Sequence, residues 1–496
     1  MTPAAGAHHP PPTASIGPAR TPGAPRLGRA ALAVLVLLTG LTMLISYANK
    51  TRCVGPEFDA VGRSAPDYED RHYRDLCYTD IQHLWVGRDL DQHTFPYLHG
   101  GITEDGTLTG GTVEYPVLTG LVMWAGAYLA HTDGEFLRDS ALLLAPFGLL
   151  VGWLLGWLSR WRALLWAIGT PLLLYAFHNW DLPAVACSVA AVAVLHGRSA
   201  PRDRAEFVRR ASWAGVLLGL GFAVKLYPGA FVLPLALYVL TRGEAGRRDR
   251  TLDWTGALRV VAASAATVIA LNLPFALLGY GGWRASFTFQ ELRKVDSTTN
   301  SLWYWGFRPY SEPDNRVFQA MVDWLSPTLV LLSFTVAVGL GWRRYRRTGT
   351  YPWVAVSAAM LAGFLLLHKV HSPQYALWLV PFFVLLRIRW GWIVGYFAAD
   401  LAIGLGIFRW FYAVRAGVGY DVFSGLSAQA VMIGVWGRAA LLVALFGVFL
   451  NAEATFPGSG RSSRSPGAAN PGSSNDGSAP GEDRLLEVSH PGNPAP

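Results

Sequence analysis

Charged side chains are scarce in this sequence. Asp, Glu, Lys and Arg make up 15% of its 496 residues, whereas soluble domains carry about 25%. Apolar residues make up 52% and gather in runs along almost the whole chain. Runs of about 20 residues can cross a hydrocarbon core of roughly 30 Å as helices. The alternating pattern of a membrane barrel is missing, so we expect an all-α polytopic membrane protein.

The sequence also lacks the motifs of several enzyme classes. It contains no Walker A loop, no glycine-rich dinucleotide motif after a strand and no HExxH. These absences argue against nucleotide-dependent and zinc-protease chemistry, and we expect no cofactor. The net charge of +8 comes mainly from short loops between apolar runs. This distribution is typical of membrane proteins and does not indicate nucleic-acid binding.

Cysteine is rare, with three residues and no zinc-finger spacing. Cys53 and Cys77 lie in the first long loop, whereas Cys187 lies in an apolar run. If that loop is outside the cell, Cys53 and Cys77 could form a disulfide. Two unpaired thiols fit the sequence equally well.

Composition divides the chain into three parts. Residues 1–29 are rich in Pro and Ala, and residues 451–496 are rich in Gly, Ser and Pro, so both are expected to be disordered cytoplasmic segments. Residues 30–450 are expected to form the membrane domain. The first apolar run, Ala30–Tyr47, has no evident cleavage site after it, so we expect a retained helix rather than a signal peptide.

Arginine-rich loops predict the orientation. Gly197–Ala211 and Thr241–Arg259 hold five Arg each and Arg343–Arg347 holds four, so we place all three in the cytoplasm. The loops at residues 48–113 and 279–323 then face outward. Counting three full spans between residues 116 and 177 would put the two termini on opposite sides of the membrane, whereas both are expected in the cytoplasm. We therefore expect about twelve spans, with one of those three segments short, re-entrant or wrongly divided.

Polar residues that could carry chemistry converge on the outer face. Cations could neutralise a phosphate, aromatic rings could stack on a sugar, and a carboxylate could act as a base. The candidates are Asp80, His83, Asp89, Asp91, Glu114, Tyr115, His178, Asn179, Asp181, Lys225, Tyr227, Arg284, Arg293, Lys294, His368, Lys369, His371 and Gln374.

The segment around Asp80 has a structural alternative. Ile81, Leu84 and Trp85 share one face of a predicted helix, so the segment could be an interfacial amphipathic helix with Asp80 simply solvated. From spacing alone, this alternative is favoured over a catalytic role.

Structural roles also fit the later candidates. The apolar run that contains Lys225 lies between two cytoplasmic loops, so we expect a hinge at Tyr227–Pro228 that turns the chain back. Lys225 would then need a cavity or an acidic partner. His368 and His371 could be interfacial groups, and Asp181 is better explained as a helix cap.

Several stretches, in this order, resemble glycosyltransferase family 87. They are Asp80 after the first span, VEYPVLTGL at residues 113–121, HNWDLPAVA at residues 178–186, the segment 214–237 that contains KLYPG, and HKVHSPQYALWLVPF at residues 368–382. The resemblance covers about residues 30–450 and implies a GT-C fold. It also implies an actinobacterial-type hexosyltransferase that transfers mannose, as that family does, from a polyprenyl-phosphate donor with inversion.

The resemblance implies roles for individual residues. Asp80 matches the general base of the first loop, and Lys225, Lys369 and His371 are expected to bind the donor phosphate. The expected substrate-binding residues are Glu114, Tyr115, Tyr227, His368 and Gln374. Some GT-C relatives bind a metal through paired acids, but Ile81 and Gln82 follow Asp80 here. No metal is therefore expected.

The expected partners are the lipid-linked donor, a cell-envelope glycan or glycolipid acceptor, and membrane lipid. The resemblance places the protein in the plasma membrane with its site on the extracytoplasmic side. A transporter or flippase of lipid-linked sugars is the alternative, although no clear inverted repeat supports it. Such a protein would use the same cations without a base at Asp80. A structural subunit of an envelope complex would need neither.

Overall fold

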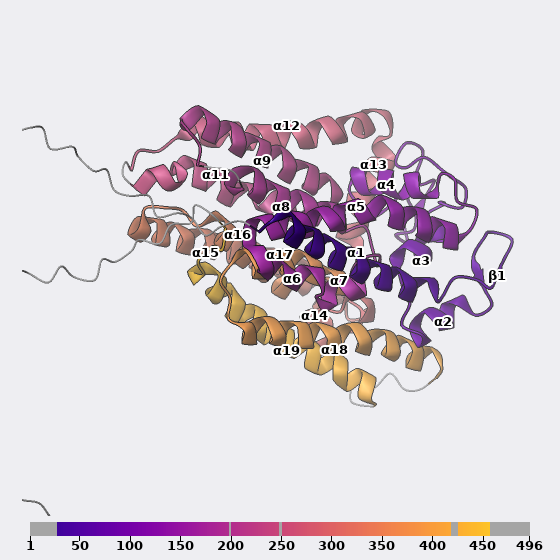
Figure 1. Ribbon diagram of the computed structural model, residues 1–496. Helices are drawn as coiled ribbons and strands as arrows, with labels where there is room; N and C mark the ends of the chain where they lie inside the picture. Colours follow the sequence, from indigo (N-terminus) through magenta and orange to yellow (C-terminus); the bar gives the residue numbers. More distant parts are fainter. Residues whose placement is uncertain (1–26, 198–199, 248–249, 418–424, 457–496) are drawn as a thin grey trace, which may run out of the picture. The chain divides into compact units, whose positions relative to one another are not determined.

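The computed structural model describes residues 27–197, 200–247, 250–417 and 425–456. Of the segments expected to be disordered, 1–29 and 451–496, residues 1–26 and 457–496 lie outside the described residues. The described chain is mainly helical, and many of its helices run side by side (Figure 1).

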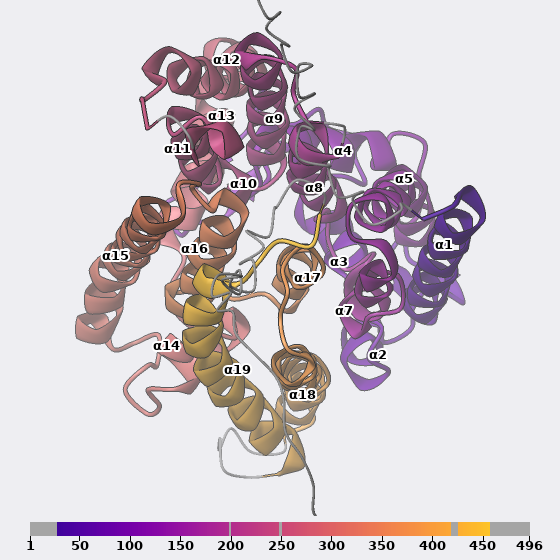
Figure 2. The same ribbon diagram turned by 60° about the vertical axis from the view of Figure 1, so that its left-hand side comes forward.

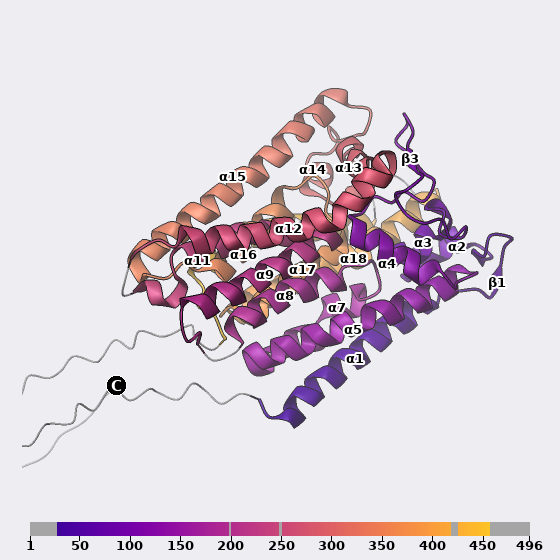
Figure 3. The ribbon, with the colours of Figure 1, turned by 90° about the horizontal axis from the view of Figure 1, so that it is seen from above.

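The first part of the chain holds one long helix and a large folded loop. Its elements are α1 (Arg29–Thr51), β1 (Glu57–Phe58), β2 (Ser64–Ala65), α2 (Tyr68–Arg74), α3 (Asp80–Gly87), β3 (Gly101–Ile102) and β4 (Leu108–Thr109). The strands form two antiparallel pairs, β1 with β2 and β3 with β4. The loop elements gather at one end of the long helices (Figure 3). A large folded first loop is therefore confirmed.

The middle part is a series of helices of unequal length. Its elements are α4 (Val117–Ala127), α5 (Asp133–Ser159), η1 (Arg160–Ala163), α6 (Leu164–Ala167), α7 (Thr170–Tyr175), α8 (Leu182–His196), α9 (Arg204–Val224), α10 (Tyr227–Ala230), α11 (Val232–Leu240), η2 (Gly243–Arg247) and α12 (Trp254–Leu278).

The last part contains a second non-spanning segment and further long helices. Its elements are α13 (Tyr280–Leu292), η3 (Ser297–Thr299), α14 (Leu302–Trp305), α15 (Arg316–Thr348), α16 (Trp353–Leu367), η4 (Pro373–Tyr375), α17 (Ala376–Leu385), α18 (Trp390–Arg415) and α19 (Leu426–Asn451).

The all-α polytopic membrane class is confirmed. Among the described residues, seven helical stretches are long and apolar enough to cross a membrane. They are Arg29–Thr51, Asp133–Ala167, Arg204–Val224, Trp254–Leu278, Arg316–Thr348, Trp390–Arg415 and Leu426–Asn451. Shorter apolar helices of 10–17 residues accompany them. The number of crossings stays a prediction.

The region between residues 116 and 177 is irregular, as expected. Helix α4 has 11 residues and α5 has 27, whereas the last expected span is broken into the short helices α6 and α7. A capping box starts α5: Thr132 accepts a hydrogen bond from the backbone N–H of Glu135, and the Glu135 carboxylate accepts one from His131. Pro171 lies in the first turn of α7, where its missing N–H costs nothing.

The KLYPG hinge is also confirmed. Helix α9 ends at Val224, Lys225 is extended, and α10 begins at Tyr227 with Pro228 in its first turn. The chain thus breaks where proline predicts, and Lys225 lies in the break.

Helix α17 lies at the centre of the packing. All ten of its residues are buried, and it contacts α5, α7, α8 and α16. Figure 2 shows it enclosed by neighbouring helices. Because η4 leads directly into α17, the segment around Pro373 is held by the most buried helix of the described chain.

Helix α3 packs on the protein rather than on a membrane surface. Ile81, Leu84 and Trp85 are buried, and the Trp85 ring lies 5.5 Å from the ring of Phe136 in α5. The Trp85 indole also donates a hydrogen bond of 2.8 Å to the carbonyl of Val61. The apolar face that suggested an interfacial helix therefore fixes α3 against α5 instead.

Candidate active site

Asp80 is the first residue of α3 and is held against the turn between α7 and α8. Thr79 caps the helix by accepting a hydrogen bond from the N–H of Ile81, and its hydroxyl donates to the carbonyl of Phe177 at 2.7 Å. The N–H of Asp80 donates to the carbonyl of His178 at 2.9 Å. These bonds fix the position of the Asp80 backbone relative to the HNWD turn.

Both carboxylate oxygens of Asp80 accept hydrogen bonds. The Tyr78 hydroxyl donates to Oδ1 at 2.8 Å, and Nδ2 of Asn179 donates to Oδ2 at 2.6 Å. Two donors with good geometry favour the ionised form of a carboxyl group. The side chain is therefore presented as an oriented carboxylate.

The pKa of Asp80 reflects these contacts. Burial by itself raises the pKa, but nearby His178 and the hydrogen bonds from Asn179 and Tyr78 lower it, and the net pKa lies below the ordinary value. Burial lowers the pKa of His178 to about 3. That ring is thus neutral at pH 7, so the two hydrogen bonds are what stabilise the carboxylate.

Asn179 also connects Asp80 to Lys225. The Lys225 ammonium donates to Oδ1 of Asn179 at 2.8 Å and lies 4.1 Å from the centre of the Tyr115 ring. It forms an ion pair at 3.9 Å with Oδ1 of Asp181, and the same oxygen accepts a hydrogen bond from Trp378. The buried lysine has the acidic partner and the polar surroundings that its position requires.

A cavity of about 800 Å³ lies in front of Asp80. Its walls come from the first loop, the HNWD turn, the KLYPG hinge, the segment after α13, the segment around η4, and α18. The charged and amide side chains that line it are Asp80, His83, Arg88, Glu104, Asp105, Glu114, His178, Asn179, Lys225, Gln290, Arg293, Lys294, Asp296, Asn300 and Gln374. Tyr73, Tyr78, Tyr115, Tyr375, Phe289, Phe408 and Phe411 supply its aromatic surface.

Asp80 differs from the other carboxylates of the cavity. Glu114 forms a double hydrogen bond with Arg88, the shorter at 2.6 Å. Asp296 accepts hydrogen bonds from Thr298 at the start of η3, and Asp105 from neighbouring threonines in an exposed turn. Of these four carboxylates, Asp80 is the one held by an uncharged donor from a distant segment, Asn179.

The structure brings together five of the nine residues to which the resemblance assigned catalytic, phosphate-binding or substrate-binding roles. Asp80, Glu114, Tyr115, Lys225 and Gln374 all line the cavity. They come from segments spread over nearly three hundred positions of the chain. The order of the motifs in the sequence did not predict how close these side chains lie to one another in space.

Four other predicted residues are not among the residues that line the cavity. Lys369 pairs with Asp323 at 2.6 Å. Tyr227 stacks on Trp378, with ring centres 4.2 Å apart. The remaining two, His368 and His371, are described next.

The two histidines of the HKVHSPQ segment are packed beside the cavity. His368 stacks on Phe364 at 4.6 Å and accepts a hydrogen bond from the N–H of Val370. His371 is buried, with its ring centre 5.5 Å from that of Tyr375. Because Tyr375 lines the cavity, His371 lies behind the wall.

Sequence reasoning gave too little weight to three groups of cavity residues. Tyr78 and Arg88 stood in the segment that contains Asp80, but a tyrosine or arginine near an acid is no specific signal. Asn179 was among the outer-face candidates but was given no role. Arg293 and Lys294 had been placed on the outer face, and their adjacency after α13 was the available signal.

Of the two alternatives for Cys53 and Cys77, a disulfide or two unpaired thiols, the structure contains the disulfide. Cys53 and Cys77 are joined, with their Cα atoms 6.0 Å apart. The bond connects the end of α1 to the segment that precedes Asp80. Cys187 in α8 is a free cysteine.

Comparison with known proteins places the chain in a family. Residues 192–443 match the family described as Mannosyltransferase (PIG-M). The chain belongs to this mannosyltransferase family. It is accordingly a membrane glycosyltransferase, which agrees with the helical architecture and with the cavity.

Individual proteins are also similar to this chain. The GPI mannosyltransferase 1 of Trypanosoma brucei brucei (strain 927/4 GUTat10.1) is 26% identical over 361 residues, which cover 70% of this chain and 76% of that protein. Crystal structures of ArnT from Cupriavidus metallidurans, in the apo state and bound to undecaprenyl phosphate, are 15% and 14% identical. Each covers 85% of this chain and 78% of its own, with a TM-score of 0.39. Likeness at that level does not establish a shared mechanism.

Proposed function

We propose that the protein transfers mannose from a polyprenyl-phosphate donor to a glycan or glycolipid acceptor at the outer face of the plasma membrane. The observation that carries this proposal is the position of Asp80. Its oriented carboxylate faces the same cavity as Lys225, Arg293 and Lys294. A base and several cations in one cavity suit the attack of a hydroxyl on a sugar that leaves from a phosphate.

In the proposed reaction, Asp80 accepts the proton of the acceptor hydroxyl. The hydroxyl oxygen forms a bond to the anomeric carbon while the bond from that carbon to the phosphate oxygen breaks. The electron pair of the broken bond remains on the polyprenyl phosphate. Direct displacement inverts the anomeric centre, so a β-linked donor gives an α-linked product.

Cations at the cavity stabilise the charge on the leaving phosphate. Lys225 is available from the hinge, and Arg293 and Lys294 lie on the opposite segment after α13. Among the described residues, neither Arg293 nor Lys294 forms an ion pair like that of Arg88 with Glu114. We therefore assign the phosphate to Lys225, Arg293 and Lys294, in preference to Lys369 and His371.

Glu114, Tyr115 and Gln374 are proposed to contact the sugar or the acceptor. Glu114 is fixed by Arg88, and Gln290 donates a hydrogen bond of 3.0 Å to the Glu114 carbonyl. Tyr115 accepts a hydrogen bond from Asn179 at 2.8 Å, so its ring is fixed beside Asp80. The finer resemblance to glycosyltransferase family 87 supports the polyprenyl-phosphate donor.

Replacement of Asp80 by Asn tests the proposal. Membranes that contain the variant are incubated with polyprenyl-phosphate mannose, and the products are identified by mass spectrometry. Loss of a general base lowers transfer by roughly 10²- to 10⁴-fold, while donor binding persists. The control is Glu57→Gln, an exposed carboxylate of β1 in the same loop. Transfer that survives in Asp80→Asn would contradict the base assignment.

A further inference from the structure

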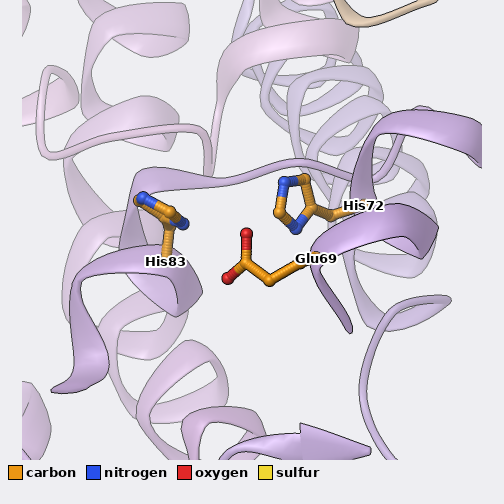
Figure 4. Close-up of side chains that lie close together, drawn as sticks. All are labelled: Glu69, His72 and His83. Carbon is orange, nitrogen blue, oxygen red and sulfur yellow. The ribbon is translucent and has the colours of Figure 1, made fainter. Parts of the chain in front are cut away.

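A cluster of metal-ligating side chains lies beside Asp80. Glu69 and His72 are three residues apart on α2, and His83 is three residues after Asp80 on α3. Residues three apart share one face of a helix. The potential ligand atoms of Glu69, His72 and His83 all lie within 4.8 Å of one another. Figure 4 shows the three side chains directed toward a common point.

The ring nitrogens of the histidines have few polar partners. His72 is fully buried, and neither of its ring nitrogens makes a hydrogen bond within the usual geometric limits to a described residue, although the Tyr68 backbone lies close to the ring. Nδ1 of His83 likewise makes no such hydrogen bond to a described residue. Buried polar groups are costly unless they are paired. Packing against Tyr68 and Tyr73, with ring centres 4.8 and 3.9 Å away, accounts for the burial of the His72 ring but not for its nitrogens.

Two arginines lie near the cluster. Arg63 and Arg415 add positive charge near the cluster, but Arg415 is paired with Asp70 at 2.8 Å.

Negative charge nearby compensates for the arginines. Glu69 belongs to the cluster, and Asp80 lies close enough to favour a positive charge at His83. The Arg63 guanidinium donates to the His83 carbonyl at 3.0 Å and is also paired with buried Asp133 at 3.3 Å. A divalent ion at the cluster would therefore face Asp80 as well as its own carboxylate ligand.

We propose that Glu69, His72 and His83 bind one Zn²⁺ ion that connects α2 to α3 next to Asp80. Two imidazoles and a carboxylate are a frequent ligand set for zinc, with bonds of about 2.0–2.2 Å. Ligand atoms at that distance from one ion lie roughly 3.4 Å apart, so the side chains draw closer on binding. Glu69 is exposed and can move to do so.

The ion would act as a positioning element. His83 lines the cavity and shares α3 with Asp80, whereas Tyr73 of α2 packs on Phe411 of α18, with ring centres 5.2 Å apart. Fixing α2 to α3 thus fixes the first loop relative to the far wall of the cavity. This site differs from a paired-acid metal motif, whose absence led to the expectation of no metal.

Zinc binding by the full-length, disulfide-bonded protein tests the proposal. The purified protein is treated with a chelator, titrated with Zn²⁺ against a fluorescent competitor, and analysed for metal content by mass spectrometry. The wild type should bind one equivalent with a dissociation constant below micromolar, and Glu69→Gln should bind at least tenfold more weakly. Glu69 is exposed, so this variant should fold. Equal binding by the wild type and Glu69→Gln, or no binding by the wild type, would overturn the proposal.

Two further readouts distinguish this site from adventitious binding. Co²⁺ should give visible d–d absorption in the wild type that changes in His83→Gln and persists in His131→Gln, an exposed histidine outside the cluster. Zn²⁺ should raise the melting temperature of the wild type and of His131→Gln but not that of Glu69→Gln. Identical spectra or shifts in all variants would contradict the assignment. None of these measurements uses sugar transfer, so their outcome is independent of the proposed function.

Discussion

At the scale of single residues, the pH dependence of the enzyme should follow the donors to Asp80. Tyr78→Phe removes the hydrogen bond to Oδ1, which favours the charged form. Burial remains, so the pKa of Asp80 rises and the acidic limb of the kcat/KM profile moves to higher pH, by about one unit for a bond of roughly 1.4 kcal/mol. Activity at high pH is little changed.

Tyr73→Phe is the matched control for this measurement. Tyr73 stacks on Tyr78, with ring centres 5.7 Å apart, and also lines the cavity. No hydrogen bond from it to Asp80 is among the described contacts. Its loss should leave the acidic limb in place. A profile that moves equally in both variants would assign the effect to packing rather than to the donor.

The cations of the cavity should differ in importance. Lys294→Gln should lower transfer about tenfold or more, since a charge that faces the leaving phosphate contributes mainly in the transition state. Lys369→Gln should have a much smaller effect because Lys369 pairs with Asp323 away from the cavity. The measurement is kcat/KM with the lipid donor. The reverse order would restore Lys369 as the phosphate ligand.

Residue identity alone explains part of this site. The Asp80, EYP, HNWD and KLYPG segments could be singled out because carboxylates and cations at the ends of apolar runs are unusual. Their partners could not be predicted, since the hydrogen bonds between Asn179 and Asp80 and between Lys369 and Asp323 depend on the packing of distant segments. For the same reason, Glu69 was not connected with His83.

At the scale of elements, α13 depends on a close approach to the first loop. A Cβ atom at Gly282 would lie 2.3 Å from the backbone carbonyl oxygen of Tyr97, which no side-chain rotation can relieve. At neighbouring Gly281 the nearest atom is 3.4 Å away. Overpacking of this kind costs about 1–3 kcal/mol. Gly282→Ala should therefore lower the melting temperature in detergent, and Gly281→Ala should not.

This comparison also tests the position of the first loop. The Tyr97 hydroxyl donates to the carbonyls of Tyr115 and Pro116, at 2.9 and 3.1 Å. A shift of Tyr97 is thus transmitted to Tyr115 beside Asp80. Equal stability of the two alanine variants would show that the loop does not pack on α13 as described.

The elements show where hydrophobic patterns predict structure and where they fail. Long apolar runs predicted the long helices, and proline predicted the hinge after Lys225. The same runs could not reveal that the segment after α5 is broken into α6 and α7. Apolar residues are frequent both in the protein interior and in contact with lipid. An apolar run therefore does not show which of the two environments its residues occupy.

At the scale of the whole molecule, labelling should establish the sides of the membrane. Single cysteines at Glu57 and Glu104 should react with an impermeant maleimide in intact cells, and cysteines at Arg202 and Arg346 should react only after lysis. All four positions are exposed. Cys187→Ser, with the Cys53–Cys77 disulfide retained, is the background. Labelling in the opposite order would overturn the orientation inferred from the arginine-rich loops.

The amide of Asn179 has a consequence for the timing of the reaction. It accepts a hydrogen bond from Lys225 on its oxygen and donates one to Asp80 from its nitrogen, so each bond polarises the other. When Asp80 takes up the acceptor proton, it becomes a weaker acceptor for the Asn179 N–H group. The Asn179 oxygen then becomes a weaker acceptor for Lys225. In the proposed reaction, the lysine would then be released as negative charge builds on the departing phosphate. Proton capture by Asp80 would thereby free the counter-charge of neighbouring Lys225.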